Sequence, residues 1–314
     1  MPTFNTSEFL DAAIQSVLQQ QLPPGFRIEL LVVDDGSTAA AMLQTLARIE
    51  AQKHSTIRVF RMPRNGGVSR ARNFGIAQAR GRYLAFLDSD DLWVPDHLCT
   101  HLGLMLETGV GITGSDYDSV QADGTVHSPA HFANHPRKGL ALRQAFASGK
   151  PVVYETPTPM FIDCCPTTTT VITIDRKQFA EDEVRFAEHL LQAEDLHLWT
   201  RLAANSSFCF TPRATAMYRN NPESLSRRVS LRERAAWHVA ALEDLSAGAV
   251  GRRWGPQLQT RLCEALVTLA YTHRKVGEFR LALLVGIRAL SVRPTYRPAI
   301  KETLRAGLAA VVRR

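Results

Sequence analysis

The chain has 314 residues, 45% of them hydrophobic, which is enough for one large α/β domain with an appendage. It contains no run of about eighteen apolar residues, and no basic stretch followed by an apolar one at its start, so we expect a cytoplasmic protein without a spanning helix or a signal peptide. The five cysteines are scattered without C-x-x-C spacing, which argues against a zinc site or a disulfide framework.

The net charge of +7 is distributed unevenly. Residues 229–314 contain fifteen Lys or Arg and six Asp or Glu, a net +9, whereas residues 1–228 have a net charge of −2. We therefore divide the chain into a domain over 1–228 and a basic helical region over 229–314. Such an appendage is suited to contact with an anionic membrane or an acidic partner, although solvated helix faces have the same composition. Nucleic acid is not expected, because no recognisable module or interleaved aromatic residues accompany the charge.

The chain begins with the turn-like stretch Pro2-Thr3-Phe4-Asn5, followed by a helical pattern over residues 7–18. This arrangement is typical of a strand-to-helix turn. Because nothing before Pro2 could form a strand, we expect the first strand to be missing and the start to be truncated or mis-assigned.

Strands and helices then alternate along the chain. Residues 28–33 predict a buried strand that ends in Asp34 and Asp35, residues 56–62 a short strand, and residues 68–79 a helix after the loop 63–67. The alternation predicts a Rossmann-like α/β fold with a mostly parallel central sheet. The loop glycines do not fit G-x-G-x-x-G, so a dinucleotide site is not supported. Arg70 and Arg72 lie in the first turns of the helix, where a diphosphate would be favoured.

The next apolar run, residues 83–87, ends abruptly in three acids, Asp88, Asp90 and Asp91. It predicts a strand buried on both faces, and ligands of open α/β sheets bind beyond the carboxyl ends of such strands. Carboxylates at i and i+2 can hold one Mg²⁺ or Mn²⁺ ion, which keeps its other positions for water and phosphate. The alternative is that these acids are ordinary turn formers or helix caps.

Residues 121–165 carry little signal. His127, His131 and His135 are spaced to line one face of a helix, which could indicate a metal site, but Pro129 and Pro136 would break that helix. We expect a polar acceptor loop here.

Beyond this segment, residues 167–174 predict a strand and the region after 231 predicts helices. Residues 194–202 predict an amphipathic helix that opens with Glu194 and Asp195. Acids in a first turn are favoured by the helix dipole, so capping alone could account for them.

Four motifs in this order resemble the nucleotide-binding half of the family 2 glycosyltransferases: Pro-Thr-Phe-Asn, Val-Val-Asp-Asp-Gly-Ser-Thr, Asn-Gly-Gly-Val-Ser-Arg-Ala-Arg-Asn-Phe-Gly-Ile and Phe-Leu-Asp-Ser-Asp-Asp. They cover residues 2 to about 100. The resemblance implies a GT-A fold that binds a nucleotide-diphosphate sugar, with a nucleotide-binding half over about 1–100 and an acceptor half over about 101–228.

The resemblance also implies roles for individual residues. Thr3 and Phe4 would lie against the base, Asp34 and Asp35 would supply a carboxylate to base or ribose, and Arg72 would approach the diphosphate.

Asp88 and Asp90 would then be the family's Asp-x-Asp pair, with Asp90 in direct contact with the metal.

Glu-Asp followed by Leu-x-Leu-Trp at 194–199 resembles the second hallmark of the family, which implies that Asp195 is the general base of an inverting reaction. Such a reaction needs charge neutralisation at the leaving diphosphate and a base for the attacking hydroxyl. The segment 218–226 resembles the one that closes the catalytic domain, with Asn221 where several members have His.

No Gln-x-x-Arg-Trp motif is present, so we expect a single addition, with a UDP-sugar as donor and a glycan, lipid-linked or protein acceptor, in cell-surface glycan synthesis. The basic helices would then dock on the inner face of the membrane. One alternative is a sugar nucleotidyltransferase, whose Gly-rich basic loop is not seen near the start. Another is a catalytically impaired nucleotide-sugar-binding module, favoured by the missing first strand.

Overall fold

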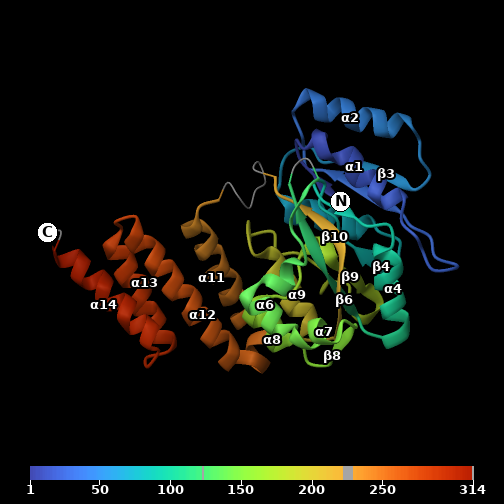
Figure 1. The fold of residues 1–314 in the computed structure, drawn as a ribbon. Coiled ribbons are helices and arrows are strands. Elements are labelled where there is room, and N and C mark those ends of the chain that lie inside the picture. The colour runs from blue at the N-terminus through green and yellow to red at the C-terminus, as the bar shows by residue number, and fades with distance from the viewer. Residues whose placement is uncertain (122–123, 222–228, 313–314) are drawn as a thin grey trace. The chain divides into compact units, whose positions relative to one another are not determined.

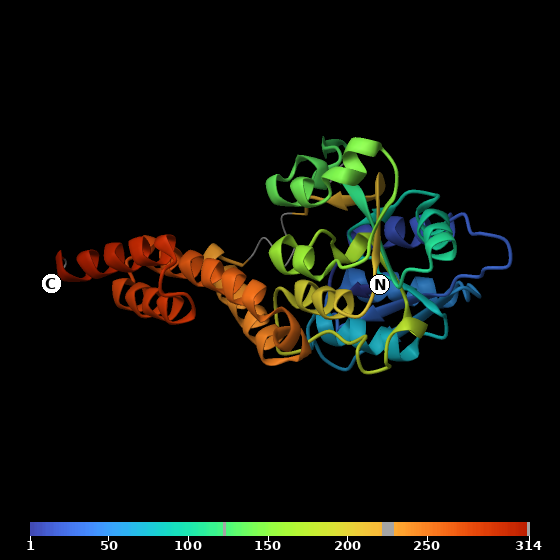
Figure 2. The same ribbon diagram turned by 90° about the horizontal axis from the view of Figure 1, so that it is seen from below.

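The computed structural model of the chain describes residues 1–121, 124–221 and 229–312, and Figures 1 and 2 show them in two views. The chain divides into two compact units, Met1–Glu188 with Leu202–Asn221, and His189–Arg201 with Pro222–Arg314. Each unit is described by itself. The division places residues 189–201 with the helical part, whereas the sequence placed them in the domain over 1–228, and the boundary at 228/229 stays a prediction.

The first unit begins with a three-stranded parallel sheet in the order β1-β2-β3. Its elements are β1 (Pro2–Thr3), α1 (Ser7–Leu18), β2 (Leu30–Asp34), α2 (Ala40–Ala51), β3 (Ile57–Arg61) and α3 (Val68–Gln78). Every residue of β2 is buried, as expected for a central strand of a parallel sheet. Helix α3 packs on β1 and β2, and α2 packs on β3. The Rossmann-like alternation predicted for this part is confirmed.

The expectation of a missing first strand is wrong. Pro2 and Thr3 form β1 and pair in parallel with Val33 and Asp34 of β2. The ladder is completed by two backbone hydrogen bonds, in which Val33 N–H donates to Met1 O and Asp35 N–H to Thr3 O, both at 2.9 Å. A two-residue strand is too short to produce a hydrophobic run, so the sequence pattern did not show it.

The second sheet has seven strands in the order β4-β9-β6-β10-β5, with β7 beside β6 and β8 beside β10. The strands are β4 (Tyr83–Ala85), β5 (Leu92–Trp93), β6 (Ile112–Val120), β7 (Val126–Ser128), β8 (Val152–Tyr154), β9 (Ile172–Asp175) and β10 (Phe208–Arg219). Only β6 and β10 pair in parallel within this sheet, and the other neighbours are antiparallel. The α/β class is thus confirmed, and its parallel part consists of the first sheet and the β6–β10 pair.

The polar loop expected over 121–165 is wrong. Apart from residues 122–123, which lie outside the described residues, this segment contains β7, β8 and the short helices α5 (His131–Asn134), α6 (Pro136–Ala141), α7 (Arg143–Ser148) and α8 (Thr158–Cys164). Helices of one or two turns are too short to show a 3.6-residue hydrophobic period, so the sequence carried no clear signal for them.

An aromatic cluster forms part of the core of the first unit around β10. The ring of Phe208 packs edge-on against Phe161 of α8, with 5.1 Å between ring centroids, and Phe210 packs against Phe146 of α7 at 5.6 Å. Gly114 of β6 lies under the Phe208 ring, where an added Cβ would come within 2.9 Å of two ring carbons. Helix α4 (His97–Thr108) packs on β6 and β10.

The second unit is helical, as the sequence predicted. It contains most of α9 (Glu194–Ala203), α11 (Leu231–Ala247), α12 (Ala249–Lys275), α13 (Phe279–Val292) and α14 (Arg297–Val312). From α11 onward each helix packs on the next, and α12 also contacts α14. Within the described ranges, no helix combines the length and the hydropathy needed to cross a membrane.

Candidate functional site

The N-terminal turn is joined to the acidic turn after β4 by three hydroxyl groups. Thr3 Oγ1 lies 3.0 Å from Thr6 Oγ1, which lies 2.9 Å from Ser89 Oγ between the two predicted metal-binding acids. Thr3 is buried and its hydroxyl is used in this chain of contacts, whereas the Phe4 side chain is 41% exposed. The structure therefore brings Thr3 and Phe4 to the same edge as the acidic turn, with Phe4 accessible for stacking.

Asp34 is committed to the turn that follows β2. Its carboxylate accepts the Ser37 N–H at 3.2 and 3.3 Å and also the Ser37 hydroxyl. The Ser37 Oγ in turn accepts the Asn5 N–H at 2.9 Å, which links this turn to the start of the chain. Asp34 is buried, so it supports the edge of the site by holding this turn in place.

Asp35 holds the loop that precedes α3. Its carboxylate accepts the N–H groups of Gly66 at 2.9 Å and Gly67 at 2.7 Å. Burial raises the pKa of Asp35, and these two N–H groups oppose the rise. Gly36 allows the close approach, because it has φ +74° and an added Cβ would lie 2.5 Å from the carbonyl carbon of Arg64.

Arg72 reaches from α3 to the acidic turn. Its Nη2 donates to Asp88 Oδ1 at 2.7 Å, and its guanidinium lies 5.1 Å from the ring centroid of Phe186. The Arg72 side chain is 5% exposed and that of Asp88 is 30% exposed. The ion pair therefore sits at the surface of the site with its carboxylate on the accessible side.

Asp90 carries an unfavourable negative charge. Burial raises the pKa of its carboxyl group, and the charge of Asp88 raises it further. Two contacts come from the end of β10 and the residues just after it. Arg219 Nε donates to the backbone O of Asp90 at 3.0 Å, and Asn221 Nδ2 donates to Asp90 Oδ2 at 3.4 Å.

Asp91, the next residue, has a structural role. It is fully buried, and its two carboxylate oxygens accept the Thr170 hydroxyl at 2.5 Å and the Arg219 N–H at 2.9 Å. Burial and the neighbouring acids raise its pKa well above the usual range. Asp91 thereby fixes the acidic turn to β10 and to the short helix Thr169–Val171.

The chemistry of the Asp88–Asp90 pair fits a hard divalent cation. Among the described residues, no three His, Cys, Asp or Glu side chains are grouped to bind a metal ion, so the pair would supply two carboxylates and leave the other positions to water and substrate. A cation between the two would relieve the repulsion that raises the Asp90 pKa. Carboxylate oxygens are the ligands that Mg²⁺ and Mn²⁺ prefer.

Asn73, next to Arg72, positions the segment that leads into α9, and the sequence analysis missed it. Its side chain bonds both backbone groups of Phe186, with Nδ2 donating to Phe186 O at 2.9 Å and Oδ1 accepting Phe186 N–H at 2.8 Å. Nδ2 also donates to Glu188 Oε1 at 3.0 Å. The only available signal was its place in the Arg-Asn pair of the third motif.

Asp195 lies in the first turn of α9, in the second unit. Its Oδ1 accepts the N–H of Leu196 at 2.7 Å, and the preceding Ala193 has φ +61°. Two residues further on, His197 Nε2 lies 3.1 Å from Asp244 Oδ2 of α11, which holds α9 within its own unit. The other predicted site residues belong to the first unit, so the role of Asp195 beside them stays a prediction.

Arg219 and Asn221 also contact the acidic turn, and neither was predicted from the sequence to be a site residue. The signal was present for Asn221, which stands where several members of the resembled family have His.

The three spaced histidines, His127, His131 and His135, do not share a helix, as Pro129 and Pro136 indicated. His131 stacks on Tyr117 with 4.7 Å between ring centroids, and His135 Nδ1 accepts the N–H of Lys138 at the start of α6.

Comparisons with known proteins identify the family of this chain. The family described as Glycosyl transferase family 2 matches residues 1–164, slightly more than half of the chain.

Two similar proteins illustrate the match. The putative teichuronic acid biosynthesis glycosyltransferase TuaG of Bacillus subtilis (strain 168) is 34% identical over 135 residues, which is 41% of this chain and 51% of TuaG. The UDP-Glc:alpha-D-GlcNAc-diphosphoundecaprenol beta-1,3-glucosyltransferase WfgD of Escherichia coli is 31% identical over 126 residues, which is 40% of this chain and 47% of WfgD. The matched part thus spans about half the length of each relative.

A solved structure shares the fold. S. aureus TarS 1-349 in complex with UDP-GlcNAc superimposes with a TM-score of 0.65, covering 97% of this chain and 87% of that one at 18% sequence identity. The motifs, the α/β fold and the family match agree. The chain belongs to glycosyl transferase family 2.

Proposed function

We propose that the chain is an inverting glycosyltransferase that moves one sugar from a UDP-sugar to an acceptor hydroxyl in the synthesis of a cell-surface glycan. The observation that supports this most strongly is the cluster in the first unit, where Arg72 pairs with Asp88 beside a half-buried Asp90 of raised pKa. The two carboxylates of this cluster would bind a cation, and its arginine would bind a negatively charged diphosphate. We assign catalysis to residues 1–228 and a separate basic helical region to 229–314.

The donor would lie across the carboxyl ends of β1 and β2. Phe4 is exposed at this edge and would stack on the base, beside the buried Thr3. Asp34 and Asp35 would bound the base and ribose, with Asp35 keeping the loop 66–67 in place through its two N–H contacts. Arg72 would turn from Asp88 toward the diphosphate when a metal ion takes over the neutralisation of that carboxylate.

Asp88 and Asp90 would hold Mg²⁺ or Mn²⁺, with Asp90 in direct contact. When bound, the ion neutralises the charge that develops on the leaving nucleoside diphosphate. Asn221 donates to Asp90 Oδ2 and would orient that carboxylate. Arg219, through its bond to the backbone of Asp90, would hold the turn that presents it.

Asp195 would act as the general base. A carboxylate that takes the proton of the acceptor hydroxyl allows a direct attack on the anomeric carbon, which inverts its configuration. One Asp195 oxygen is held by the Leu196 N–H, which leaves the other to accept that proton.

The relatives support the choice of donor and acceptor. The name of WfgD gives UDP-Glc as donor and a diphosphoundecaprenol-linked sugar as acceptor, and TuaG is named for teichuronic acid synthesis. The TarS structure contains UDP-GlcNAc. We therefore propose that the donor of this chain is a UDP-sugar. Its acceptor would be a growing glycan, carried on a lipid or on a protein.

The test uses slow hydrolysis of the donor, which needs no acceptor. Purified protein is mixed with UDP-α-glucose or UDP-α-GlcNAc and Mn²⁺, and the released sugar is followed by proton NMR before it mutarotates. We expect the β-anomer to appear first, and Asp195→Asn to lower the rate on the order of a hundredfold or more while the affinity for UDP is unchanged.

The control is Asp182→Asn, which changes an exposed acid elsewhere in the chain and should keep the wild-type rate. Initial release of the α-anomer would contradict inversion. An unchanged rate in Asp195→Asn would remove Asp195 from the role of base.

A further inference from the structure

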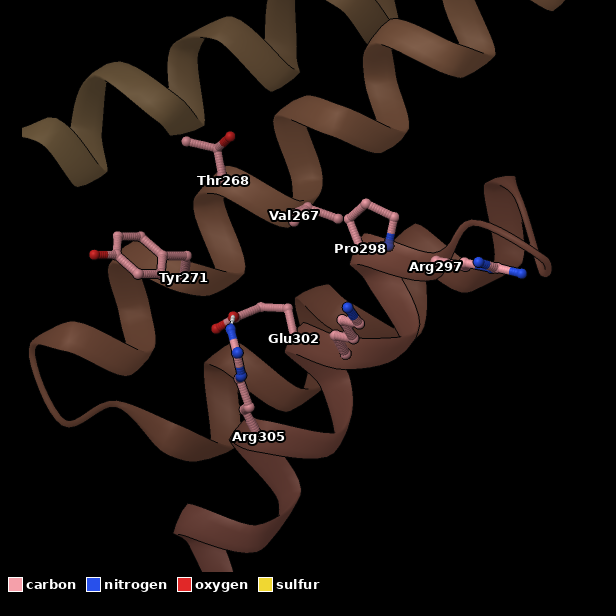
Figure 3. Close-up of a pocket in the computed structure, with 8 residues that line it drawn as sticks. Val267, Thr268, Tyr271, Arg297, Pro298, Glu302 and Arg305 are labelled. Atoms are coloured by element: carbon pink, nitrogen blue, oxygen red, sulfur yellow. Dashed lines mark ion pairs between the residues drawn. The ribbon is translucent and has the colours of Figure 1, made fainter.

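A hollow between α12 and α14 lies outside the proposed donor site. Its volume is about 360 Å³, and it is lined by Val267 and Tyr271 of α12 and by Pro298 and Arg305 of α14. Figure 3 shows Val267 beside Pro298, and Arg305 reaching toward Glu302. Lys301 of α14 also lines it. The hollow thus combines an apolar and aromatic wall with cationic side chains.

The charge around this hollow is positive. The only acid that lines it is Glu302, which is buried. Glu302 Oε1 already pairs with Arg274 Nε at 2.5 Å, and Glu302 Oε2 lies 3.9 Å from Arg305 Nη1. Among the described residues, neither Arg297 nor Lys301 has an acidic partner, and both are exposed. A single negative charge is therefore shared by two arginines while two further cations stay unneutralised.

The cations of α14 form a row. Arg297, Lys301 and Arg305 are spaced i, i+4 and i+8, so they follow one face of the helix. Tyr271, across the hollow, has a further cation near its ring, because Lys275 Nζ lies 5.6 Å from the ring centroid. Anionic groups would be attracted along the whole row.

An exposed apolar row runs beside these cations. Ile300, Leu304, Leu308 and Val311 occupy the adjacent stripe of α14, and Leu304 and Leu308 are 62% and 68% exposed. An apolar stripe bordered by Lys and Arg is typical of helices that lie in the interface of an anionic membrane.

We propose that this face of α14 docks on an anionic lipid surface, with Leu304 and Leu308 in the acyl boundary and a headgroup phosphate in the hollow beside Arg297, Lys301 and Arg305. Charge complementarity favours a membrane over a second copy of the chain. Two copies packed through this stripe would bring their cationic rows together, and such like charges repel.

The test is sedimentation of the full chain with vesicles at physiological salt. Vesicles that contain phosphatidylglycerol and phosphatidylcholine are compared with vesicles of phosphatidylcholine alone. We expect binding to the anionic vesicles only. We expect roughly tenfold or greater loss of partitioning in Leu304→Asp/Leu308→Asp and also in Arg297→Glu/Lys301→Glu.

Two matched variants serve as controls. Leu106→Asp places the same charge on an exposed leucine of α4, and Arg143→Glu/Lys150→Glu reverses two exposed cations near α7, so both should bind as the wild type does. Free glycerol phosphate at millimolar concentration should not release the protein from the vesicles. Circular dichroism of each variant checks the fold, and the two independent double variants keep the test open if one of them unfolds.

Four results would overturn the proposal: no binding to anionic vesicles, equal binding to neutral ones, release by free glycerol phosphate, or a dimer in light scattering that Leu304→Asp/Leu308→Asp dissociates. UDP affinity, measured on the same preparations, reports on the donor site separately, so failure of one proposal is distinguishable from failure of the other.

Discussion

Adjacent acids in the turn after β4 have different roles because their partners differ. Asp91 is buried with both oxygens occupied by Thr170 and Arg219, whereas Asp90 accepts one long hydrogen bond from Asn221 and is repelled by Asp88. A buried carboxylate whose two oxygens both accept hydrogen bonds stabilises the fold, whereas a half-buried one with a single long hydrogen bond is suited to bind a cation.

Alanine should therefore lower the stability much more at position 91 than at position 90. Asp91→Ala leaves the Thr170 hydroxyl and the Arg219 N–H without their acceptors, so we expect the free energy of unfolding to fall by about 2–4 kcal/mol. Asp90→Ala removes only the long hydrogen bond from Asn221 to this carboxylate, so its effect on stability should be less than about 1 kcal/mol. Urea unfolding at pH 7 measures both changes, and equal losses would contradict the distinction.

Two buried histidines on α4 are predicted to make stability depend on pH. His97 stacks on Trp93 with 4.3 Å between ring centroids, and its Nδ1 lies 2.8 Å from the Thr215 hydroxyl. His101 Nδ1 contacts the Thr113 hydroxyl at 2.9 Å. Burial lowers the pKa of His101 to about 3 and that of His97 well below its usual value, so both stay neutral in the folded state.

The unfolded chain takes up protons on these histidines below about pH 6.5, while the folded chain does not. Stability is therefore fully present above that pH and falls as the pH is lowered, by up to about 1.4 kcal/mol per pH unit for each histidine. We expect His101→Asn to reduce the slope of unfolding free energy against pH between 6 and 4.5, and His127→Asn, at an exposed position, to leave it unchanged. Urea titrations over this range give the slopes, and a slope unaffected by His101→Asn would contradict the assignment.

At the scale of elements, one side chain connects α3 with the segment before α9. Asn73→Ala removes the partners of both backbone groups of Phe186, whose ring lies against the Arg72 guanidinium. We expect about 1–3 kcal/mol less stability and faster hydrogen exchange at the Phe186 amide. Donor hydrolysis should fall more than UDP affinity, because the segment leads into the helix that carries Asp195.

Asn205→Ala is the matched control, since the exposed Asn205 side chain donates, among the described residues, to Glu183 and not to a backbone group of this segment. Unchanged exchange at Phe186 in Asn73→Ala would show that the segment is held by other contacts.

The elements that the sequence predicted are those with a strong hydrophobic pattern. Buried β2 and the amphipathic α9 were both found from apolar spacing, and the helices after residue 231 likewise. β1 was missed because two residues have no period. The short helices α5 to α8 were missed because they are held by contacts that local sequence does not encode: α5 packs on β6, α7 packs on β10, and α6 packs on α5, α7 and α8.

The candidate site shows the same limit. Asp88 and Asp90 were predicted because an acid pair after an apolar run carries its own chemical signal. The contacts of Asn73 with Phe186 and of Asn221 with Asp90 join residues 113 and 131 positions apart, so only the folded chain reveals them. Asp91 is instructive for a different reason. It looks like its neighbours in sequence, and only its burial and its two hydrogen-bonded oxygens in the folded chain separate it from them.

In the molecule as a whole, the residues that we assign to function lie in two different units. The first unit holds the cluster of Arg72, Asp88 and Asp90, and the second holds Asp195 and the cationic row of α14. We expect the donor to bind to the first unit independently of the membrane face of the second.

We propose that the Asp88–Asp90 pair forms a metal-dependent site for a nucleoside diphosphate. The most direct measurement is calorimetric titration of the purified chain with UDP, GDP, ADP and CDP, with and without Mn²⁺, repeated on Asp90→Ala and on the exposed-acid control Asp182→Ala. We expect UDP to bind only with the metal ion present and Asp90→Ala to lower its affinity by roughly tenfold or more, whereas Asp182→Ala should bind as the wild type does. Absence of binding for every nucleotide, or unchanged metal-dependent binding in Asp90→Ala, would contradict it.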